Sequence, residues 1–220
     1  MSNEKKIVWL SKGLPKTLTH KGKEYRSGIA KDQTEQLNIT FEKIVDDDVE
    51  NHEYHGGKDR VICVYPYEHY HFWESTYGKS LQKAAFGENL TTVGMKESDV
   101  CVGDVYQIGD AIVQVSQGRF PCATINKHTH IHTLLNKMIE LGYTGYFFRV
   151  LEEGTINTQS KIKQLIQHPM QLSVATIHET FFHTKELSKI ETILSVAELS
   201  NEWKVRFEKL YQQEKQKQLG

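Results

Sequence analysis

The stretch DVYQIGDAIVQVSQ, residues 104–117, decides the fold class of this chain. Its two arms are rich in β-branched residues and flank Gly109 and Asp110. β-Branched residues favour strands, and a two-residue turn containing Gly and Asp is typical of tight hairpins. The sequence therefore predicts a β-hairpin here, and the rest of the chain is interpreted around a sheet that contains it.

Other β-rich segments lie on both sides of this hairpin. Leu37, Ile39 and Phe41 alternate with other residues, which predicts a half-buried strand. RVICVYP, residues 60–66, is a nearly continuous apolar run, typical of a strand buried on both faces. Further strands are expected in the segments 6–13 and 145–156.

Two helices are expected to interrupt the strands. PYEHYHFWESTYG, residues 66–78, begins with a proline, which suits the first position of a helix. HIHTLLNKMIELGY, residues 130–143, places five apolar side chains on one helical face, and Gly142 suits its end. Both apolar stripes are interpreted as core packing.

The pattern changes after about residue 170. From Ser173 onward neither Gly nor Pro occurs before the last residue, and helices are expected at 173–183, 185–197 and 200–217. Ser173 and Ser200 are suitable N-caps. The fold class is therefore a β-rich α+β protein, in which a small three-helix region follows the strands.

Composition and charge exclude several classes of protein. The formal net charge of −1 gives no electrostatic basis for binding a nucleic acid polymer or an anionic membrane. No apolar run approaches the length of a membrane span, and no signal peptide is visible. Three widely spaced cysteines favour a reducing compartment, so a cytoplasmic location is expected.

Two glycine-containing loops are candidates for ligand binding. In HGGKDR, residues 55–60, two glycines allow backbone N–H groups to approach an anion, and Lys58 and Arg60 add positive charge. In FGENL, residues 86–90, Glu88 and Asn89 follow a glycine and precede a strand. Either loop is also explained as a simple turn with solvated polar side chains.

Cys122 is the cysteine whose position in the sequence favours a reactive thiolate. It follows Pro121 at the end of the β-rich stretch, and Arg119 lies close enough in sequence to lower the pKa of its thiol. A thiolate is a nucleophile and a soft metal ligand. Cys63 and Cys101 lie within or beside apolar strands and are interpreted as inert core residues.

Histidine clusters and common catalytic motifs add little. HTHIH, residues 128–132, would form a metal site on a strand, but here it is interpreted as the polar start of a helix. His69 and His71 are interpreted in the same way. The motifs of the common hydrolases, dinucleotide-binding proteins, P-loop proteins and zinc proteases do not occur.

Three stretches in order carry a resemblance to a known family: HGGKDRVICVYPYEHYHFWE at 55–74, AAFGENLTT at 84–92, and VCVGDVYQIGDAIVQVSQGRFPC at 100–122. Together they resemble the MOSC domain, named for the C-terminal domain of molybdenum cofactor sulfurase, and within that family the YiiM-type bacterial proteins. The resemblance implies a MOSC-type β-barrel domain at 18–163, followed by a small three-helix C-terminal domain at 170–217.

The resemblance also implies a site for the molybdenum cofactor (molybdopterin). In the family, the cysteine of the SQ-x-R-x-PC stretch binds molybdenum or its sulfur, and Cys122 stands at that position. Gly118 departs from the proline common there, which predicts a more flexible loop. Catalytic roles are implied for Cys122, Glu88 and Asp59. Cofactor binding is implied for His55, Gly56, Gly57, Lys58, Arg60, Asn89, Arg119 and Cys122.

The implied activity is that of an oxidoreductase. YiiM-type proteins resemble reductases of N-hydroxylated compounds such as hydroxylaminopurine bases, and such an enzyme needs a partner reductase as electron donor. Two alternatives stay open. One is a non-catalytic carrier that holds the cofactor or a persulfide on Cys122. The other is a metal-free thiol redox protein, which requires a second cysteine near Cys122 in space. The helical domain could dock the electron donor, form a homodimer, or cover an apolar face of the barrel.

Overall fold

The predicted hairpin is confirmed. The computed structural model describes residues 4–219, leaving aside the side chains of Tyr54 and Leu219. In it, β8 (Val105–Ile108) and β9 (Ala111–Gly118) pair antiparallel, with Ile108 opposite Ala111. Gly109 in the turn has a φ of 60°, which glycine adopts more readily than other residues.

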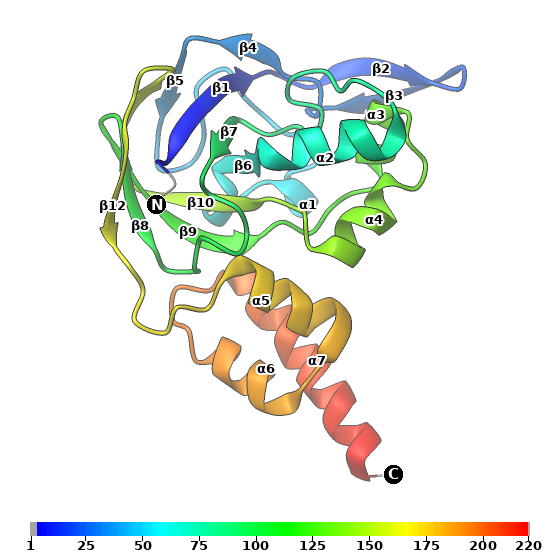
Figure 1. Cartoon of the computed structure of the whole chain (residues 1–220), viewed down its shortest axis with the longest axis vertical. Coiled ribbons are helices and arrows are strands. Elements are labelled where there is room, and N and C mark those ends of the chain that lie inside the picture. Colours follow the sequence, from blue (N-terminus) through cyan, green and yellow to red (C-terminus); the bar gives the residue numbers. More distant parts are fainter. Residues whose placement is uncertain (1–3, 220) are drawn as a thin grey trace.

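The hairpin belongs to an eight-stranded sheet with the order β12-β8-β9-β10-β6-β7-β1-β4. All neighbouring strands are antiparallel except β6 and β7, which are parallel. Register irregularities interrupt several pairings, and such bulges bend strands, so the sheet curls into a half-barrel (Figure 1). The remaining strands of this sheet are β1 (Lys6–Lys12), β4 (Asp32–Thr34), β6 (Ile62–Pro66), β7 (Leu90–Val93), β10 (Tyr146–Glu152) and β12 (Ile162–Ile166).

Two small sheets accompany the large one. One pairs β5 (Gln36–Ile39) with β11 (Gly154–Asn157), and the other pairs β2 (Lys16–His20) with β3 (Lys23–Ser27). The β2–β3 hairpin extends away from the half-barrel beside α3 (Figure 1). The strand expected around Leu37 ends at Ile39, and Phe41 is 49% exposed, so the alternation stops two residues earlier than predicted.

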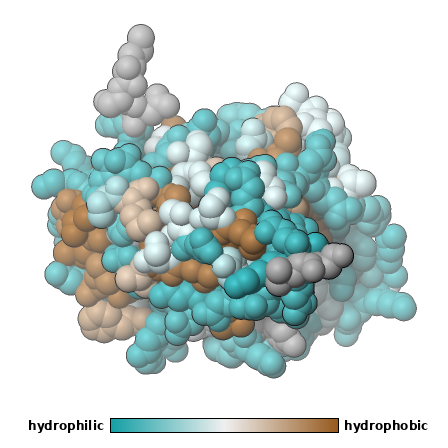
Figure 2. Space-filling model, turned by 90° about the horizontal axis from the view of Figure 1, so that it is seen from below, coloured by the Kyte–Doolittle hydropathy of each residue, from teal (hydrophilic) through white to brown (hydrophobic). Residues whose placement is uncertain are grey.

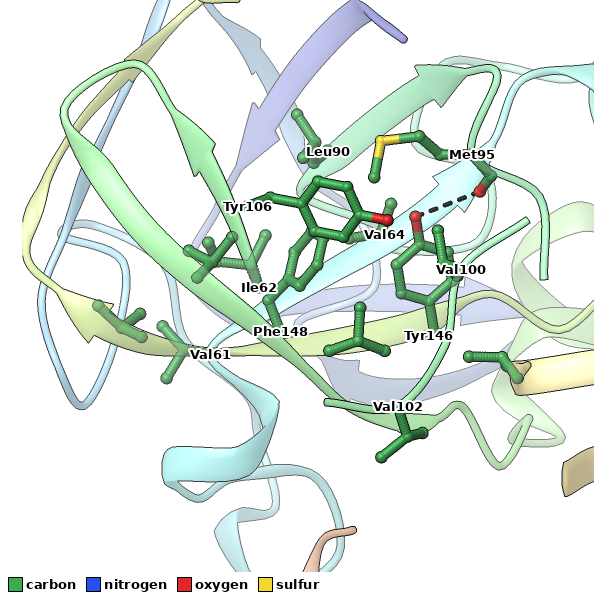
Figure 3. Close-up of a cluster of buried hydrophobic side chains, with 14 of the residues drawn as sticks. Val61, Ile62, Val64, Leu90, Met95, Val100, Val102, Tyr106, Tyr146 and Phe148 are labelled. Carbon is green, nitrogen blue, oxygen red and sulfur yellow. Dashed lines mark hydrogen bonds between the residues drawn. The ribbon is translucent and has the colours of Figure 1, made fainter. Parts of the chain in front are cut away.

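The main core lies inside the curled sheet and consists mostly of aliphatic side chains, among which Tyr106, Tyr146 and Phe148 are large aromatic ones contributed by the strands (Figure 3). Tyr106 and Phe148 have ring centroids 5.9 Å apart, and the Tyr146 hydroxyl donates to the Met95 carbonyl at 3.2 Å. Every residue of β6 is buried, as the apolar run predicted. Burying a side chain of this size contributes about 1.5–3 kcal/mol, so this core dominates the stability of the fold.

The helices near the sheet differ in their bounds from those predicted. Pro66 ends β6 and α2 (Glu68–Tyr77) begins two residues later, because Pro66 remains paired opposite Thr92 in the sheet. The segment expected as one helix at 130–143 contains only α4 (Leu134–Leu141). α3 (Thr124–Thr129) precedes it and ends at His130 in a left-handed conformation. The histidines of HTHIH therefore do not start a helix. Gly142 ends α4 as predicted.

The helical C-terminal region is confirmed and lies at one end of the half-barrel (Figure 1). It comprises α5 (Val174–Glu179), a π-helical turn η2 (Thr180–Thr184), α6 (Leu187–Leu194) and α7 (Asn201–Leu219). Ser173 caps α5 by accepting from the Thr176 amide, and Ser200 accepts from the Trp203 amide at 3.3 Å. Apolar side chains of these helices belong to the same core cluster as the sheet.

Viewed from the end at which the helical region lies, the surface is mostly hydrophilic, with an apolar area along one side (Figure 2). Large apolar side chains that remain exposed include Leu165, Ile166 and Met170. Surfaces of this kind commonly bind other proteins, and the homodimer stays a prediction. Between residues 4 and 219, no helix has both the length and the apolar character that crossing a membrane requires.

Candidate functional site

A cavity of about 590 Å³ collects side chains from distant parts of the chain around Cys122. Its wall includes the end of β3, the 47–55 segment, the start of β6, the end of β9, the loop before α3, and α7. Of the residues predicted to form the site, the cavity brings together His55, Arg60, Asn89, Arg119 and Cys122.

Cys122 is partly buried in the loop that joins β9 to α3. Its sulfur lies 3.3 Å from the Thr124 hydroxyl, and its carbonyl accepts from the Ile125 amide. A hydrogen bond from His55 lowers the pKa of the Cys122 thiol to about 6, helped by the hydroxyl and amide of Thr124 and opposed by burial. The thiol is therefore largely ionised at neutral pH.

Arg119 differs from its expected role. We expected Arg119 to lower the pKa of Cys122, but its charge acts on Cys63 and Glu88 instead. Burial raises the pKa values of both groups, and the charge of Arg119 partly offsets this rise. Its backbone amide donates to the Gly145 carbonyl at 2.9 Å. Its Nη1 atom is buried and has no hydrogen-bond partner among the described residues, so Arg119 offers the cavity an unused cationic donor.

The loop at 55–60 divides between the cavity and the surface. α1 (His52–His55) places His55 at the cavity, and η1 (Lys58–Arg60) does the same for Arg60, whose Nε donates to the Gly56 carbonyl at 2.8 Å. Gly57 has a φ of 110° and forms the turn between the two. The cofactor-binding roles of His55, Gly56, Gly57 and Arg60 stay predictions.

Lys58 and Asp59 lie outside the cavity wall. Lys58 is exposed and lies 3.5 Å from a Glu42 carboxylate oxygen. Asp59 forms an ion pair with Arg149 at 2.8 Å. The contacts of both residues are therefore with protein groups, and the catalytic role of Asp59 stays a prediction.

The loop at 87–89 is buried and closely packed. Gly87 lies at the cavity with a φ of 75°, and a Cβ there would come within 2.9 Å of Ile29 Cγ1. Glu88 is fully buried and accepts from the Tyr70 hydroxyl at 2.5 Å and the Thr91 hydroxyl at 2.9 Å. These hydrogen bonds stabilise the loop, and the Glu88 side chain does not line the cavity wall, so a direct role in proton transfer stays a prediction.

Asn89 connects this loop to its neighbours. Its side-chain oxygen accepts from the Cys63 amide at 3.1 Å, and its Nδ2 donates to Ser11 and to Asp47 at 3.2 and 3.0 Å. These bonds fix β6 against β1 and position Cys63, which also lines the cavity. Cys63 was interpreted as a core residue; the structure shows it 6% exposed at the cavity wall.

Gly118 does not carry the flexibility predicted for it. It is the last residue of β9, its carbonyl accepts from Trp203 Nε1 at 2.8 Å, and a Cβ there would lie 2.4 Å from His178 Nε2. Only glycine permits this close approach. The helical region therefore fixes the backbone that leads into the Cys122 loop.

Several cavity residues were not predicted to belong to the site, although Gln117 stands in the SQ-x-R-x-PC stretch. Gln117 lies in β9, and Glu202 and Arg206 lie on α7, at least eighty residues from Cys122. Gln117 Oε1 is buried without a partner among the described residues. Neither spacing nor composition connects Glu202 and Arg206 with the site, because only the packing of the helical region against the sheet brings them to it.

The cavity residues fit a large anionic ligand that offers soft metal chemistry. Three residues with suitable groups line the same cavity: Cys122 with its thiolate, Arg119 with an unpartnered donor and Gln117 with an unpartnered acceptor. Soft metals prefer thiolate ligands, and arginine suits phosphate. Within residues 4–219, no group of three or more His, Cys, Asp and Glu could hold a metal ion, and the metal-binding role of Cys122 stays a prediction.

Comparison with known proteins identifies the family. A family model described as the MOSC domain matches residues 51–163. The uncharacterized protein YflK of Bacillus subtilis is 40% identical over 92% of this chain and 93% of its own length. The crystal structure of YiiM from Geobacillus stearothermophilus superposes with a TM-score of 0.81 at 32% identity, covering 94% of this chain and 99% of that one.

A more local similarity concerns a protein of Gibberella moniliformis named as a reductase. It is 35% identical over 106 residues, which is 46% of this chain and 19% of that protein. The family model covers half of the chain, and the similarities to YflK and to the Geobacillus structure extend over nearly all of it. This chain therefore belongs to the MOSC domain family.

Proposed function

We propose that this chain binds the molybdenum cofactor in the Cys122 cavity and reduces N-hydroxylated compounds. The observation that carries the proposal is the Cys122 thiol, whose pKa falls to about 6 in a cavity that also contains the unpartnered Nη1 of Arg119. A thiolate beside a free cationic donor suits a metal cofactor that carries a phosphate. Membership of the MOSC family and the reductase name of the Gibberella relative support the same conclusion.

The residues of this chain have separate parts in that activity. Cys122 would ligate the metal, and Arg119 and Arg60 would bind the cofactor's anionic groups. His55, which hydrogen-bonds the thiol, would keep it ionised before the cofactor binds. When bound, the molybdenum centre would supply the two-electron chemistry that cleaves the N–O bond.

The reaction needs a co-reactant that the protein does not contain. An N-hydroxylated compound takes up two electrons and two protons, its N–O bond breaks, and the amine and water leave. The electrons would come from a donor reductase. The apolar part of the wall, which includes Val61, Ile125 and Phe147, suits a planar substrate such as a purine base.

The test compares wild type with Cys122→Ser after expression in a host that makes the cofactor. We expect about one molybdenum per chain and reduction of hydroxylaminopurine by a chemical electron donor in wild type, and neither in the variant. Metal content is measured by mass spectrometry and folding by circular dichroism. Full metal content and turnover in a folded Cys122→Ser protein would contradict the proposal. Metal without turnover in wild type would favour a carrier.

One observation bears on a thiol redox function. Cys63 lines the same cavity as Cys122, so a second cysteine does lie in this region. Burial raises the pKa of the Cys63 thiol, which keeps it protonated and a poor partner for thiol exchange. The metal-binding role of Cys122 is therefore the better supported one.

A further inference from the structure

The helical C-terminal region contributes two charged side chains to the cavity. Glu202 and Arg206 lie one turn apart on α7, and both line the wall. The start of α7 is attached to β9, because the Ser200 amide donates to the Ser116 carbonyl at 3.1 Å and Trp203 is bonded to Gly118. The two side chains therefore have a defined position relative to the loop that carries Cys122.

The charges on the cavity wall do not balance. Five basic and three acidic side chains line it. Each carboxylate contacts a cation, in the pairs Arg26–Glu50, Lys31–Asp47 and Arg60–Glu202. Arg206 shares Glu202 with Arg60, and Arg119 has a buried Nη1 without a partner among the described residues. The wall therefore carries surplus positive charge beside Cys122.

Arg206 is held in a geometry suited to anion binding. Its Nε and Nη2 donate to one oxygen of Glu202 at 3.3 and 3.0 Å. Its guanidinium lies over the ring of Phe120, 4.3 Å from the ring centroid. Among the described residues, its Nη1 has no hydrogen-bond partner. A guanidinium fixed on two sides and open on a third loses little side-chain entropy when it binds a phosphate or a carboxylate.

We propose that Arg206, held over Phe120 by Glu202, is an anion-binding residue of this cavity and, with Arg119, draws a phosphate-bearing or carboxylate-bearing ligand to Cys122. The helical region is then part of the binding site as well as a cover for the sheet. The attraction acts on any anion that enters the cavity, so it does not depend on which cofactor or substrate the protein uses.

The first experiment uses the metal-free protein and two alkylating probes that differ in charge. Iodoacetate is anionic and iodoacetamide is neutral, and both react with the Cys122 thiolate. The ratio of their rates cancels any change in the fraction of thiolate, so it reports the electrostatic attraction of the reagent alone. We expect Arg206→Gln to lower the iodoacetate-to-iodoacetamide ratio about threefold to tenfold relative to wild type.

Matched variants separate local from general effects. Lys204→Gln removes the same charge from the same helix, but Lys204 donates to the Ala197 carbonyl and does not line the cavity, so its ratio should stay close to that of wild type. Arg206→Lys keeps the charge and should keep most of the preference. Peptide mass spectrometry confirms that the label is on Cys122. An unchanged ratio in a folded Arg206→Gln protein, or an equal fall in Lys204→Gln, would overturn the proposal.

A second experiment distinguishes the two sources of the anion, and this arm rests on the proposed function. If the anion is the cofactor's phosphate, Arg206→Gln retains less molybdenum than wild type after purification. If it belongs to the substrate, metal content is unchanged and KM rises for an N-hydroxylated nucleotide but not for the free base. A variant that matches wild type in both measurements would count against the proposal even if the enzyme is active.

Discussion

Cys63 and Cys122 line one cavity, but their surroundings act on the two thiols in opposite directions. Cys63 lies in the fully buried strand β6, and burial raises its pKa. Cys122 lies in a loop, where the hydrogen bond from His55 outweighs a smaller effect of burial and lowers its pKa to about 6. The charge of Arg119 lowers the pKa of Cys63, but this effect is smaller than the rise that burial causes.

The difference shows that a hydrogen-bond partner and partial exposure decide thiol ionisation at this site more than a nearby arginine does. Asn89 holds both backbone groups of Cys63. Its side-chain oxygen accepts from the Cys63 amide, and its backbone amide donates to the Cys63 carbonyl at 2.8 Å. Cys122 instead has partners, His55 and Thr124, that contact the sulfur itself. One cysteine is held by its backbone and the other is activated through its side chain.

The contrast predicts a large difference in reactivity. At pH 7, iodoacetamide should modify Cys122 about a thousandfold faster than Cys63, because Cys122 is mostly thiolate whereas Cys63 is protonated and reacts only when the strand opens. Peptide mass spectrometry over time measures both rates in one sample. Cys101 is an internal control, since burial raises its pKa to about 11. Similar rates at Cys63 and Cys122 would contradict the comparison.

The second prediction concerns a variant in which the backbone of Cys63 loses hydrogen bonds. Asn89→Ala removes three side-chain hydrogen bonds and leaves buried groups of Cys63, Ser11 and Asp47 without that partner. We expect the free energy of unfolding to fall by about 2 kcal/mol or more and Cys63 to become more reactive.

Urea denaturation measures this loss of stability. Asn136→Ala is the matched control, because Asn136 is exposed on α4, and it should change stability by less than about 0.5 kcal/mol. If Asn89→Ala is no less stable than this control, the hydrogen bonds of Asn89 do not hold the strands together.

Much of the fold could be predicted because its signals are local. The Gly109–Asp110 turn, the apolar run of β6 and the serine caps at Ser173 and Ser200 each depend on a few neighbouring residues. The helix boundary at Pro66 was wrong because a proline that suits a helix start also suits a strand end, and pairing with β7 decides between them. The β2–β3 hairpin has no strong apolar alternation and was not predicted.

The site could be predicted only where it coincides with a motif. His55, Arg60, Asn89, Arg119 and Cys122 stand in motif stretches, and the cavity brings them together. Glu202 and Arg206 stand in the last helix, outside every motif stretch, and only the packing of α7 on β9 places them at the site. The influence of His55 on Cys122 also depends on a contact between residues 67 positions apart.

The third prediction concerns a variant that lacks the main cause of the low pKa of Cys122. His55→Gln should raise that pKa from about 6 towards its ordinary value, so the alkylation rate at pH 7 should fall about tenfold, because a smaller thiolate fraction is only partly offset by greater nucleophilicity. In wild type the rate should fall as the pH drops through about 6, and in the variant the same fall should occur at higher pH. His52→Gln is the control, since His52 is exposed on α1 and pairs with Asp48. An unshifted pH profile in His55→Gln would assign the low pKa to other groups.

The smallest expected effect concerns the other partner of the Cys122 sulfur. Thr124→Val removes the hydroxyl 3.3 Å from the sulfur but keeps the shape of the side chain and the Thr124 amide, which also lowers the pKa. The alkylation rate at pH 7 should therefore fall only about twofold, and Thr124→Ser, which keeps a hydroxyl, should match wild type. The pH profile of alkylation measures both variants. A shift in Thr124→Val as large as that in His55→Gln would mean that the start of α3 controls the thiolate as strongly as the histidine of α1 does, which would contradict the order of the two effects.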